Sequence, residues 1–417
     1  SQAWPKRRLI PIESMEMESV MNTAREIVLI TGAGRGIGAA IAERLGDDAP
    51  DFMHDYAAEA AMLAGRSVTA ADWQGLVARR LPGTGPLDRL AAALGDPVTL
   101  ALLLTIGLAA EDSRFGAAMG ENGRLTLGTL VGLWRQHGGR DDPQAVRRSV
   151  GQMVALGIVH AVNPDAPRLD QELALSAAAW DALGGEVTAP PGCRFVPVTD
   201  LPALDELVLD PATASRAAAL AEAMAADAEL AVTIRGPSRN GRRTLAGALA
   251  RAMQCPLLHV DTDTPEAWRQ AGLFAFLHEA LVVTAPQLAP GETRDLPGFA
   301  IEPVRLVIIT GHSGGIRTTD RPQVTLALPM PGLDERQLHW KAALPAIDPA
   351  TAHRLAAAFQ LTSGTIRRAA RGAAVLARQS ERETPNRTDV RLALRDLQDS
   401  RLETVAARVE TGAVGEF

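Results

Sequence analysis

The fold of this chain is decided by residues 230–244, which read LAVTIRGPSRNGRRT. The apolar start predicts a buried strand, the glycine-containing middle predicts a loop, and the LAGALARAM of residues 245–253 predicts a helix. A strand, a glycine loop and a helix in this order are typical of a phosphate-binding loop, whose template is G-x-x-x-x-G-K-[ST]. In that template, backbone N–H groups surround the phosphates, Lys reaches the outer phosphates and the hydroxyl group holds Mg²⁺.

The loop departs from this template at the positions that carry the chemistry. Gly236 and Gly241 are in place. Arg242, however, stands at the Lys position and Arg243 at the Ser or Thr position, while Thr244 comes one position late. A guanidinium group can bind phosphate through two hydrogen bonds, so Arg242 is compatible with retained nucleotide binding. Two interpretations stay open: a module that binds nucleotide with little hydrolysis, and an empty structural module.

A second glycine loop lies near the N-terminus, where residues 27–45 read IVLITGAGRGIGAAIAERL. This stretch resembles the opening β-α unit of the short-chain dehydrogenases, whose pattern is T-G-x-x-x-G-x-G. One β-α unit is too short to form a dinucleotide-binding fold, which needs further parallel strands. The pattern matches at Thr31, Gly32, Gly36 and Gly38.

The other parts of a dehydrogenase are missing from the sequence. A ribose-binding acid is expected about 20 residues after the glycines, but the acids at positions 47, 48 and 51 come before any second strand. The resemblance also implies a Tyr followed four residues later by a Lys, yet the single tyrosine is Tyr56 and Ala60 follows it. We therefore expect a dehydrogenase-like segment without the enzyme, and keep an NAD(P)-dependent oxidoreductase as a third alternative.

Composition bounds the class of protein. The 417 residues are enough for about three domains. A hydrophobic content of 47% excludes general disorder. The formal net charge of −7 argues against a dedicated nucleic-acid binder, which needs a basic surface. Cys193 and Cys255 are far apart and have no His or Cys at ligand spacing, so neither a zinc site nor a disulfide framework is expected, and a reduced, cytoplasmic protein is the default.

Targeting and membrane signals are also weak. The basic residues 6–8 are followed by an apolar stretch that Pro11 and several glutamates interrupt, so export is not expected. The most apolar run, residues 98–110, is shorter than the roughly 20 residues that a membrane helix requires. It predicts a buried core helix instead.

Residues 144–162 predict a helix followed by a strand. Asp142-Pro143 is a helix start signal, and Gly157 ends the pattern. A second strand is expected near residues 168–175, after a turn at residues 163–165, and a helix followed by such a hairpin outlines a winged-helix module. Arg147 and Arg148 permit a DNA interpretation, but the acidic total favours a solvated helix face. The apolar face of the helix is expected to comprise Val146, Val150, Met153 and Val154.

An alternating β and α pattern follows the proline-rich residues 188–197. Short apolar strands alternating with helices predict a parallel, doubly wound sheet. Helices are expected after the first two strands and an irregular link after the third. The remaining residues, 334–408, show helix patterns without a long strand. The strands are expected at residues 230–234, 257–260, 281–284, 305–310 and 323–328.

Five motifs resemble, in order, the N-terminal half of AAA+ proteins encoded with phage-tail-like contractile injection systems. The similarity covers about residues 83–410. It implies a winged-helix-like region, a first ATPase module with degenerate motifs, and then a second module with an intact phosphate loop, before which this chain stops. The motifs are LLLTIGLAAEDSRF (102–115), LDELVL (204–209), GRRTLA (241–246), LDERQLHW (333–340) and LTSGTIR (361–367).

The resemblance implies roles at particular positions. A Walker B strand ends in Asp-Glu, which act on Mg²⁺ and water, but Thr284 and Ala285 occupy these positions here. Glu279 lies at the beginning of that strand and is expected on the surface. Thr310 is placed where a polar sensor of the γ-phosphate belongs. The alternative is that this threonine is present only because β-branched residues favour strands. Arg367 is placed as a second sensor, with a solvated helix position as the alternative.

These expectations combine into one organisation and one leading function. We expect an α/β fold in which a winged-helix-like region precedes a P-loop AAA+ parallel-sheet module with an all-helical lid. The leading function is nucleotide binding and assembly with itself, other AAA+ subunits or injection-system proteins, with ATP or ADP as the ligand and Mg²⁺ doubtful. An active ATPase is the competing alternative. The expected parts are a tail (1–23), a dehydrogenase-like segment (24–50), a winged-helix-like domain (57–187), a linker (188–200), an AAA+ core (201–332) and a helical lid (333–410).

Overall fold

The computed structural model divides the chain into two compact units. The first unit runs to Pro191 and includes Thr264–His278 and Phe299–Glu302; the second contains the rest of the chain. The expected tail (1–23) and glycine segment (24–50) lie outside the described residues. So do residues 57–84 of the expected winged-helix-like domain and residues 403–410 of the expected lid. The structure describes residues 85–95, 97–111, 125–137, 143–183, 185–262, 264–289, 291–311, 314–319 and 321–402.

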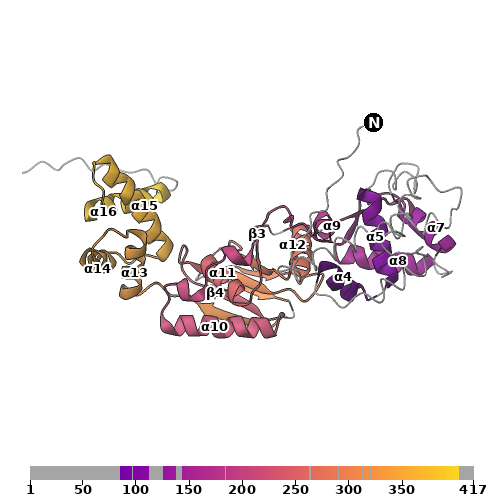
Figure 1. The fold of residues 1–417 in the computed structure, drawn as a ribbon, viewed down its shortest axis with the longest axis horizontal. Helices are drawn as coiled ribbons and strands as arrows, with labels where there is room; N and C mark the ends of the chain where they lie inside the picture. Colours follow the sequence, from indigo (N-terminus) through magenta and orange to yellow (C-terminus); the bar gives the residue numbers. More distant parts are fainter. Residues whose placement is uncertain are drawn as a thin grey trace, which may run out of the picture. The chain divides into compact units, whose positions relative to one another are not determined.

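The described residues of the first unit are mainly helical (Figure 1). Its small sheet consists of β1 (Val159–Ala161) and β2 (Leu173–Leu175), which pair antiparallel, and a bridge between Thr126 and Glu172 extends it. The predicted second strand is shorter than expected because Arg168–Asp170 form a 3₁₀ turn. The helices are α4 (Pro86–Leu94), α5 (Pro97–Glu111), α7 (Leu127–His137), α8 (Pro143–Ala155), α9 (Ala177–Leu183) and α12 (Pro265–His278), the last of which packs against α4 and α9.

Helix α8 shows how periodicity set the buried face of this unit. Val146, Val150 and Met153 are buried, as expected. The prediction that Val154 shares this face is wrong, because its side chain is 37% exposed. At 3.6 residues per turn, Val154 lies about 80° round the helix from Val146 and falls at the border of the apolar stripe. Arg147, about 100° round the helix from Val146, is exposed.

The second unit is built on a six-stranded sheet in the order β10-β4-β8-β6-β5-β3. The first five strands in this order are parallel, and β3 pairs antiparallel with β5 at the edge. The fold is therefore mixed α/β with a mostly parallel central sheet. The strands are β3 (Cys193–Val196), β4 (Ala231–Arg235), β5 (Leu257–Val260), β6 (Leu281–Thr284), β8 (Leu306–Thr310) and β10 (Gln323–Ala327).

Strand β3 lies inside the stretch expected to be a linker, residues 188–200. Its register pairs Cys193 with Val260 and Val196 with Leu257. The prolines that suggested a linker bracket this four-residue run without entering it, so they permit a short edge strand. The second unit accordingly begins at Gly192 rather than at residue 201.

The link after β6 is more ordered than the sequence indicated. Within it, β7 (Thr293–Leu296) pairs in parallel with β9 (Gly315–Thr318), which follows β8. Arg317 donates two hydrogen bonds to Asp295 across this pair, at 2.7 and 3.2 Å. The connections that leave β6 and β8 are thus joined to each other by a small separate sheet.

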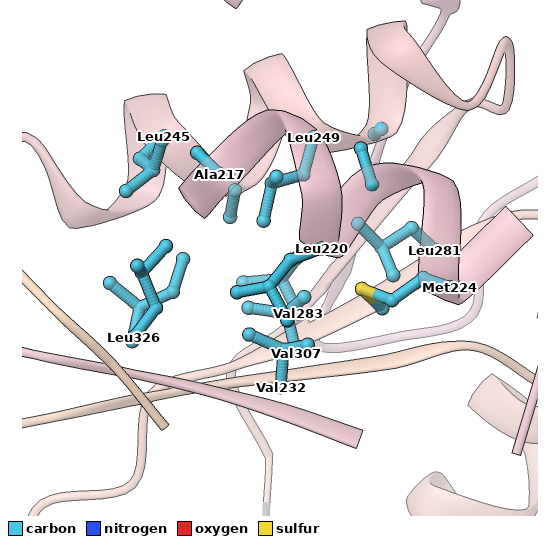
Figure 2. Packing of buried hydrophobic residues seen from close by; sticks show 14 of the residues in the cluster. Ala217, Leu220, Met224, Val232, Leu245, Leu249, Leu281, Val283, Val307 and Leu326 are labelled. Atoms are coloured by element: carbon cyan, nitrogen blue, oxygen red, sulfur yellow. The ribbon is translucent and has the colours of Figure 1, made fainter. Parts of the chain in front are cut away.

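One face of the main sheet is covered by α10 (Pro211–Ala226) and α11 (Arg242–Ala252) (Figure 2). Pro211 at the first helical position and Asp210, whose carboxylate accepts from the Thr213 N–H at 2.9 Å, start α10. The strands read as continuous apolar runs because both their faces are buried. The packed side chains include Ala217, Leu220, Met224, Leu245, Leu249, Val232, Val283, Val307 and Leu326.

Four helices form the C-terminal part of the second unit. They have a core of their own around Trp340, with several alanines that let the helices approach closely. Asp348 caps one helix by accepting from the Thr351 N–H at 2.9 Å. Together we call them the helical bundle: α13 (Leu333–Ala343), α14 (Pro349–Ala358), α15 (Ser363–Gln379) and α16 (Arg387–Leu402).

Candidate functional site

The strand order of the second unit selects one edge of its sheet for ligand binding. The connection from β4 runs past β8 and β6 to reach β5, whereas the connection from β8 runs past β4 to reach β10. The two connections therefore leave the sheet in opposite directions, which opens a crevice between the carboxyl ends of β4 and β8. Ligands of open parallel sheets bind at such switch points.

The glycine loop, residues 236–241, lies at this switch point. A Cβ on Gly236 would lie 2.4 Å from the carbonyl oxygen of Leu328, so only glycine fits there. Gly241 has φ +79° and directly precedes α11, in a backbone conformation that favours glycine. The side-chain amide of Asn240 donates to the carbonyl groups of Leu328 and Pro329, at 3.3 and 2.6 Å. These contacts hold the loop against the segment that follows β10.

The N-terminus of α11 is open for an anion. The first N–H groups of any helix lack acceptors within the helix, and no side chain caps this one. The helix dipole adds partial positive charge at the same place. A phosphate group is the ligand that suits such a terminus.

Both arginines of the loop are engaged by the protein itself. The guanidinium group of Arg242 donates a hydrogen bond to the backbone carbonyl of Thr310, at the end of β8. Burial, and secondarily the charge of Arg243, lower the pKa of Arg242 from its ordinary value. Arg243 donates to Asp261 at 3.4 Å, with side chains that are 56% and 61% exposed. An exposed pair of this kind contributes about 0–1 kcal/mol.

Thr310 and Asn240 each have a buried polar atom without a hydrogen-bond partner in the described residues. The side chain of Thr310 is 2% exposed, and its Oγ1 has no hydrogen-bond partner among the described residues. The Thr310 carbonyl accepts from the Gly236 N–H at 3.3 Å as well as from Arg242. The Oδ1 of Asn240 is also buried without a partner in the described part of the chain. Buried polar atoms of this kind mark places where a ligand or water completes the hydrogen bonding.

The end of β6 offers no acid. Thr284 is buried there and Ala285 follows. Glu279 precedes β6 and is exposed, so it belongs to the opposite edge of the sheet. No cluster of His, Cys, Asp and Glu in the described residues has the arrangement of a metal site. Mg²⁺ needs hard oxygen ligands; the carboxylate at this edge, that of Asp261 after β5, is paired with Arg243, and the end of β6 adds none, so these residues do not fit the ion.

A cavity of about 200 Å³ lies beside the loop within the second unit. Five separate segments line it: the stretch before α10, the end of the loop with the start of α11, the stretch after β10, α13 and α15. Among the residues expected at the site, Gly241, Thr244 and Arg367 contribute to its wall, and Gly236, Arg242, Arg243 and Thr310 do not. The lining residues are 206–210, Asn240, Gly241, Thr244, Leu245, 328–331, Glu335, His339, Ala342, Ser363 and Arg367.

The bundle side of the cavity carries both signs of charge, with Glu335 on α13 and Arg367 on α15. Arg367 on α15 is exposed, and its charge, after burial, lowers the pKa of His339 on α13. His339 is therefore neutral at pH 7. Most of the wall was missed by sequence reasoning because its members are far apart in the chain. The available signals were the motifs themselves: LDELVL overlaps residues 206–209, and GRRTLA, LDERQLHW and LTSGTIR contain the lining residues from α11, α13 and α15.

Comparison with known proteins gives limited help. No family model and no curated protein matches the chain. Among solved structures, a point mutant of RuvB from Thermotoga maritima is 18% identical, with a TM-score of 0.35 over 47% of this chain and 73% of that one. A structure from work on katanin self-assembly is 13% identical, with a TM-score of 0.34 over 48% of this chain and 87% of that one. At these scores we assign no function from either likeness.

No helix in the described residues is long and apolar enough to cross a membrane.

Proposed function

We propose that the second unit is an AAA+ module that binds an adenine nucleotide and does not hydrolyse it efficiently. The observation that carries this proposal is the cavity at the N-terminus of α11, beside the topological switch point. A phosphate-accepting helix start and a walled cavity for the rest of the ligand are thereby adjacent. Switch points and helix starts are the places where α/β proteins bind nucleotides.

The chemistry of the wall suits the two ends of a nucleotide. Leu207, Leu209 and Met330 supply apolar surface for a base, while the neighbouring backbone groups offer donors and acceptors. The phosphates would lie against the N–H groups at the start of α11. Arg367 contributes a cation on the bundle side of the cavity.

Efficient hydrolysis is not supported by the same site. Phosphoryl transfer depends on groups that neutralise charge developing on the phosphates and that orient the water. Arg242 is bound to a backbone carbonyl, Arg243 replaces the metal-binding hydroxyl group, and Thr284 with Ala285 replaces the acids. The active ATPase remains the competing alternative. Measuring phosphate release from ATP by the purified chain distinguishes the two functions.

Assembly is the biological role that we propose for such a module. The sequence resemblance to AAA+ proteins of contractile injection systems supports a partner that is another AAA+ subunit or a second copy of this chain. In this proposal the helical bundle serves as the lid that the resemblance implies, and α8 with its hairpin as the winged helix. Size-exclusion chromatography with light scattering, with and without ADP, tests self-assembly.

Thermal unfolding of the full chain tests nucleotide binding. A ligand present at about 100 times its Kd stabilises the folded state by about 2.7 kcal/mol, so ADP or ATP should raise the midpoint. Ala342→Trp should remove this shift by filling the cavity, and Arg242→Glu should remove it by repelling phosphate. Lys341→Trp is the matched control, because this exposed neighbour on α13 does not line the cavity. Absence of any shift at millimolar nucleotide would establish the empty structural module instead.

A further inference from the structure

We infer that this site is specific for an adenine nucleoside diphosphate bound without a divalent cation, and that Arg242 excludes a third phosphate. The inference rests on the proposed nucleotide site and specifies its ligand. Three observations of the structure support it: the partner of Arg242, the residues at the metal positions, and the extent of the cavity.

Arg242 closes the place where an outer phosphate would lie. In a complete phosphate loop, the cation at this position reaches the β- and γ-phosphates. Here the guanidinium group instead spans from the start of α11 to the carbonyl of Thr310, between the carboxyl ends of β4 and β8. A third phosphate would have to displace it and break a charge-assisted hydrogen bond in a partly buried setting. The planar guanidinium is also bulkier than the compact ammonium group that it replaces.

The two positions that normally bind the metal of a triphosphate lack their hydroxyl group and their acid here. Mg²⁺ bridges the β- and γ-phosphates and takes its protein ligands from a hydroxyl group and an acid. Arg243 stands at the hydroxyl position and donates to Asp261, so a cation already occupies that side of the loop. Thr284 and Ala285 supply no carboxylate. Without a metal, the four negative charges of a triphosphate have less compensation than the three of a diphosphate.

The wall of the cavity includes the start of α11 and leaves out the side chain of Arg242. Its wall includes Gly241 and Thr244, at the start of α11. Arg242, Thr284 and Thr310, which surround the outer-phosphate position, are not among its lining residues. The backbone groups that hold the inner phosphates in a phosphate loop are therefore next to the cavity, and the side chain at the position of the outer-phosphate cation is bound to Thr310 instead.

Isothermal titration calorimetry of the full chain with ADP, AMP and ATP tests this inference, each in excess MgCl₂ and in EDTA. We expect ADP to bind about tenfold more tightly than ATP, the effect of one displaced charge-assisted hydrogen bond. EDTA should leave the ADP affinity unchanged. AMP should bind more weakly than ADP, because it leaves the start of α11 without its second phosphate.

The variant Arg242→Ala tests whether Arg242 causes the preference for ADP over ATP. Removing the side chain opens the outer position, so the ratio of ADP to ATP affinity should fall from about ten to within about twofold of one. Arg251→Ala is the matched control, since Arg251 also lies on α11 and donates to a backbone carbonyl, that of Leu201, at the other end of the helix. Its ratio should remain that of the unmodified chain.

Three results would overturn the inference while leaving nucleotide binding intact. They are ATP binding as tightly as ADP, an ADP affinity that requires Mg²⁺, and an unchanged ratio in Arg242→Ala. Failure of all three nucleotides to bind would instead refute the nucleotide site itself.

Discussion

The backbone N–H of Gly364, in the first turn of α15, donates a hydrogen bond of 2.8 Å to the carbonyl of Arg239 in the glycine loop. Arg239 has φ +61°, an uncommon conformation for a non-glycine residue, and it directs this carbonyl to the bundle. A Cβ on Gly364 would lie 2.6 Å from the same oxygen. The contact joins two walls of the cavity, which belong to segments more than 120 residues apart.

Gly364→Ala should therefore weaken nucleotide binding. The added methyl group forces α15 away from Arg239 and removes a hydrogen bond whose net contribution to stability is about 1 kcal/mol; because this bond holds two walls of the cavity together, we expect its loss to weaken ADP binding by at most about fivefold. Titration of ADP measures the change. Gly298→Ala serves as the control in the same unit, because a Cβ there meets no atom within 4 Å. Equal affinities in the two variants would show that this contact does not shape the site.

The purified chain should release phosphate from ATP no faster than a buffer control. The reason is the joint lack of the loop Lys and both acids at the end of β6, positions held by Arg242, Thr284 and Ala285. A coupled phosphate assay over a range of protein concentrations provides the measurement. Mg²⁺-dependent release that Gly241→Glu abolishes would refute this prediction and establish the active ATPase.

Gly236→Ala should destabilise the second unit. Its Cβ would lie 2.4 Å from the Leu328 carbonyl oxygen, a backbone atom that cannot move aside without shifting β10. Overpacking of this kind costs about 1–3 kcal/mol in the free energy of unfolding. Urea denaturation of the variant measures the loss. Gly315→Ala is the comparison, since its Cβ would make an ordinary 3.4 Å contact with Thr293, and equal losses in both variants would contradict the steric argument.

The buried His259 on β5 should make folding sensitive to mild acid. Burial, followed by the charge of Arg194, lowers the pKa of His259 to about 4. Between pH 6.5 and pH 4 the unfolded chain binds a proton that the folded chain does not, so stability falls as pH falls through this window. His259→Gln should show a smaller fall than the unmodified chain. His353→Gln, at an exposed position on α14, should behave like the unmodified chain; a His259 variant that does the same would disprove the assignment.

The glycine segment at residues 24–50 should not bind NADH. A dehydrogenase site needs a complete nucleotide sheet and a Tyr-Lys pair, and the sequence supplies one β-α pattern with Tyr56 unpaired. Deleting residues 1–46 should leave the thermal midpoint of the second unit nearly unchanged. Fluorescence titration of both forms with NADH measures binding. Tight binding to the full chain that the deletion abolishes would require an oxidoreductase function.

Local patterns determined much of the second unit. The strands at residues 257–260 and 281–284 were predicted with the bounds that the structure shows, because continuous apolar runs between polar residues are typical of buried parallel strands. The glycines at 236 and 241 located the loop, since each is required by the backbone itself. The absence of acids at the end of β6 was also visible in the sequence. These features depend on residues that are neighbours in the chain.

Only the tertiary structure decided what those residues contact. From the sequence, Arg242 was compatible with binding the phosphates of a nucleotide. In the structure, the strand order puts the end of β8 beside the loop, and the Thr310 carbonyl, 68 residues away, accepts a hydrogen bond from Arg242. Sequence reasoning also missed Asn240 as the residue that fastens the loop to the segment after β10. Edge strand β3 and the cavity wall arise in the same way, from pairing between distant segments. The physical reason is that local propensity depends on near neighbours, while strand order, burial and hydrogen-bond partners are set by which distant segments pack together.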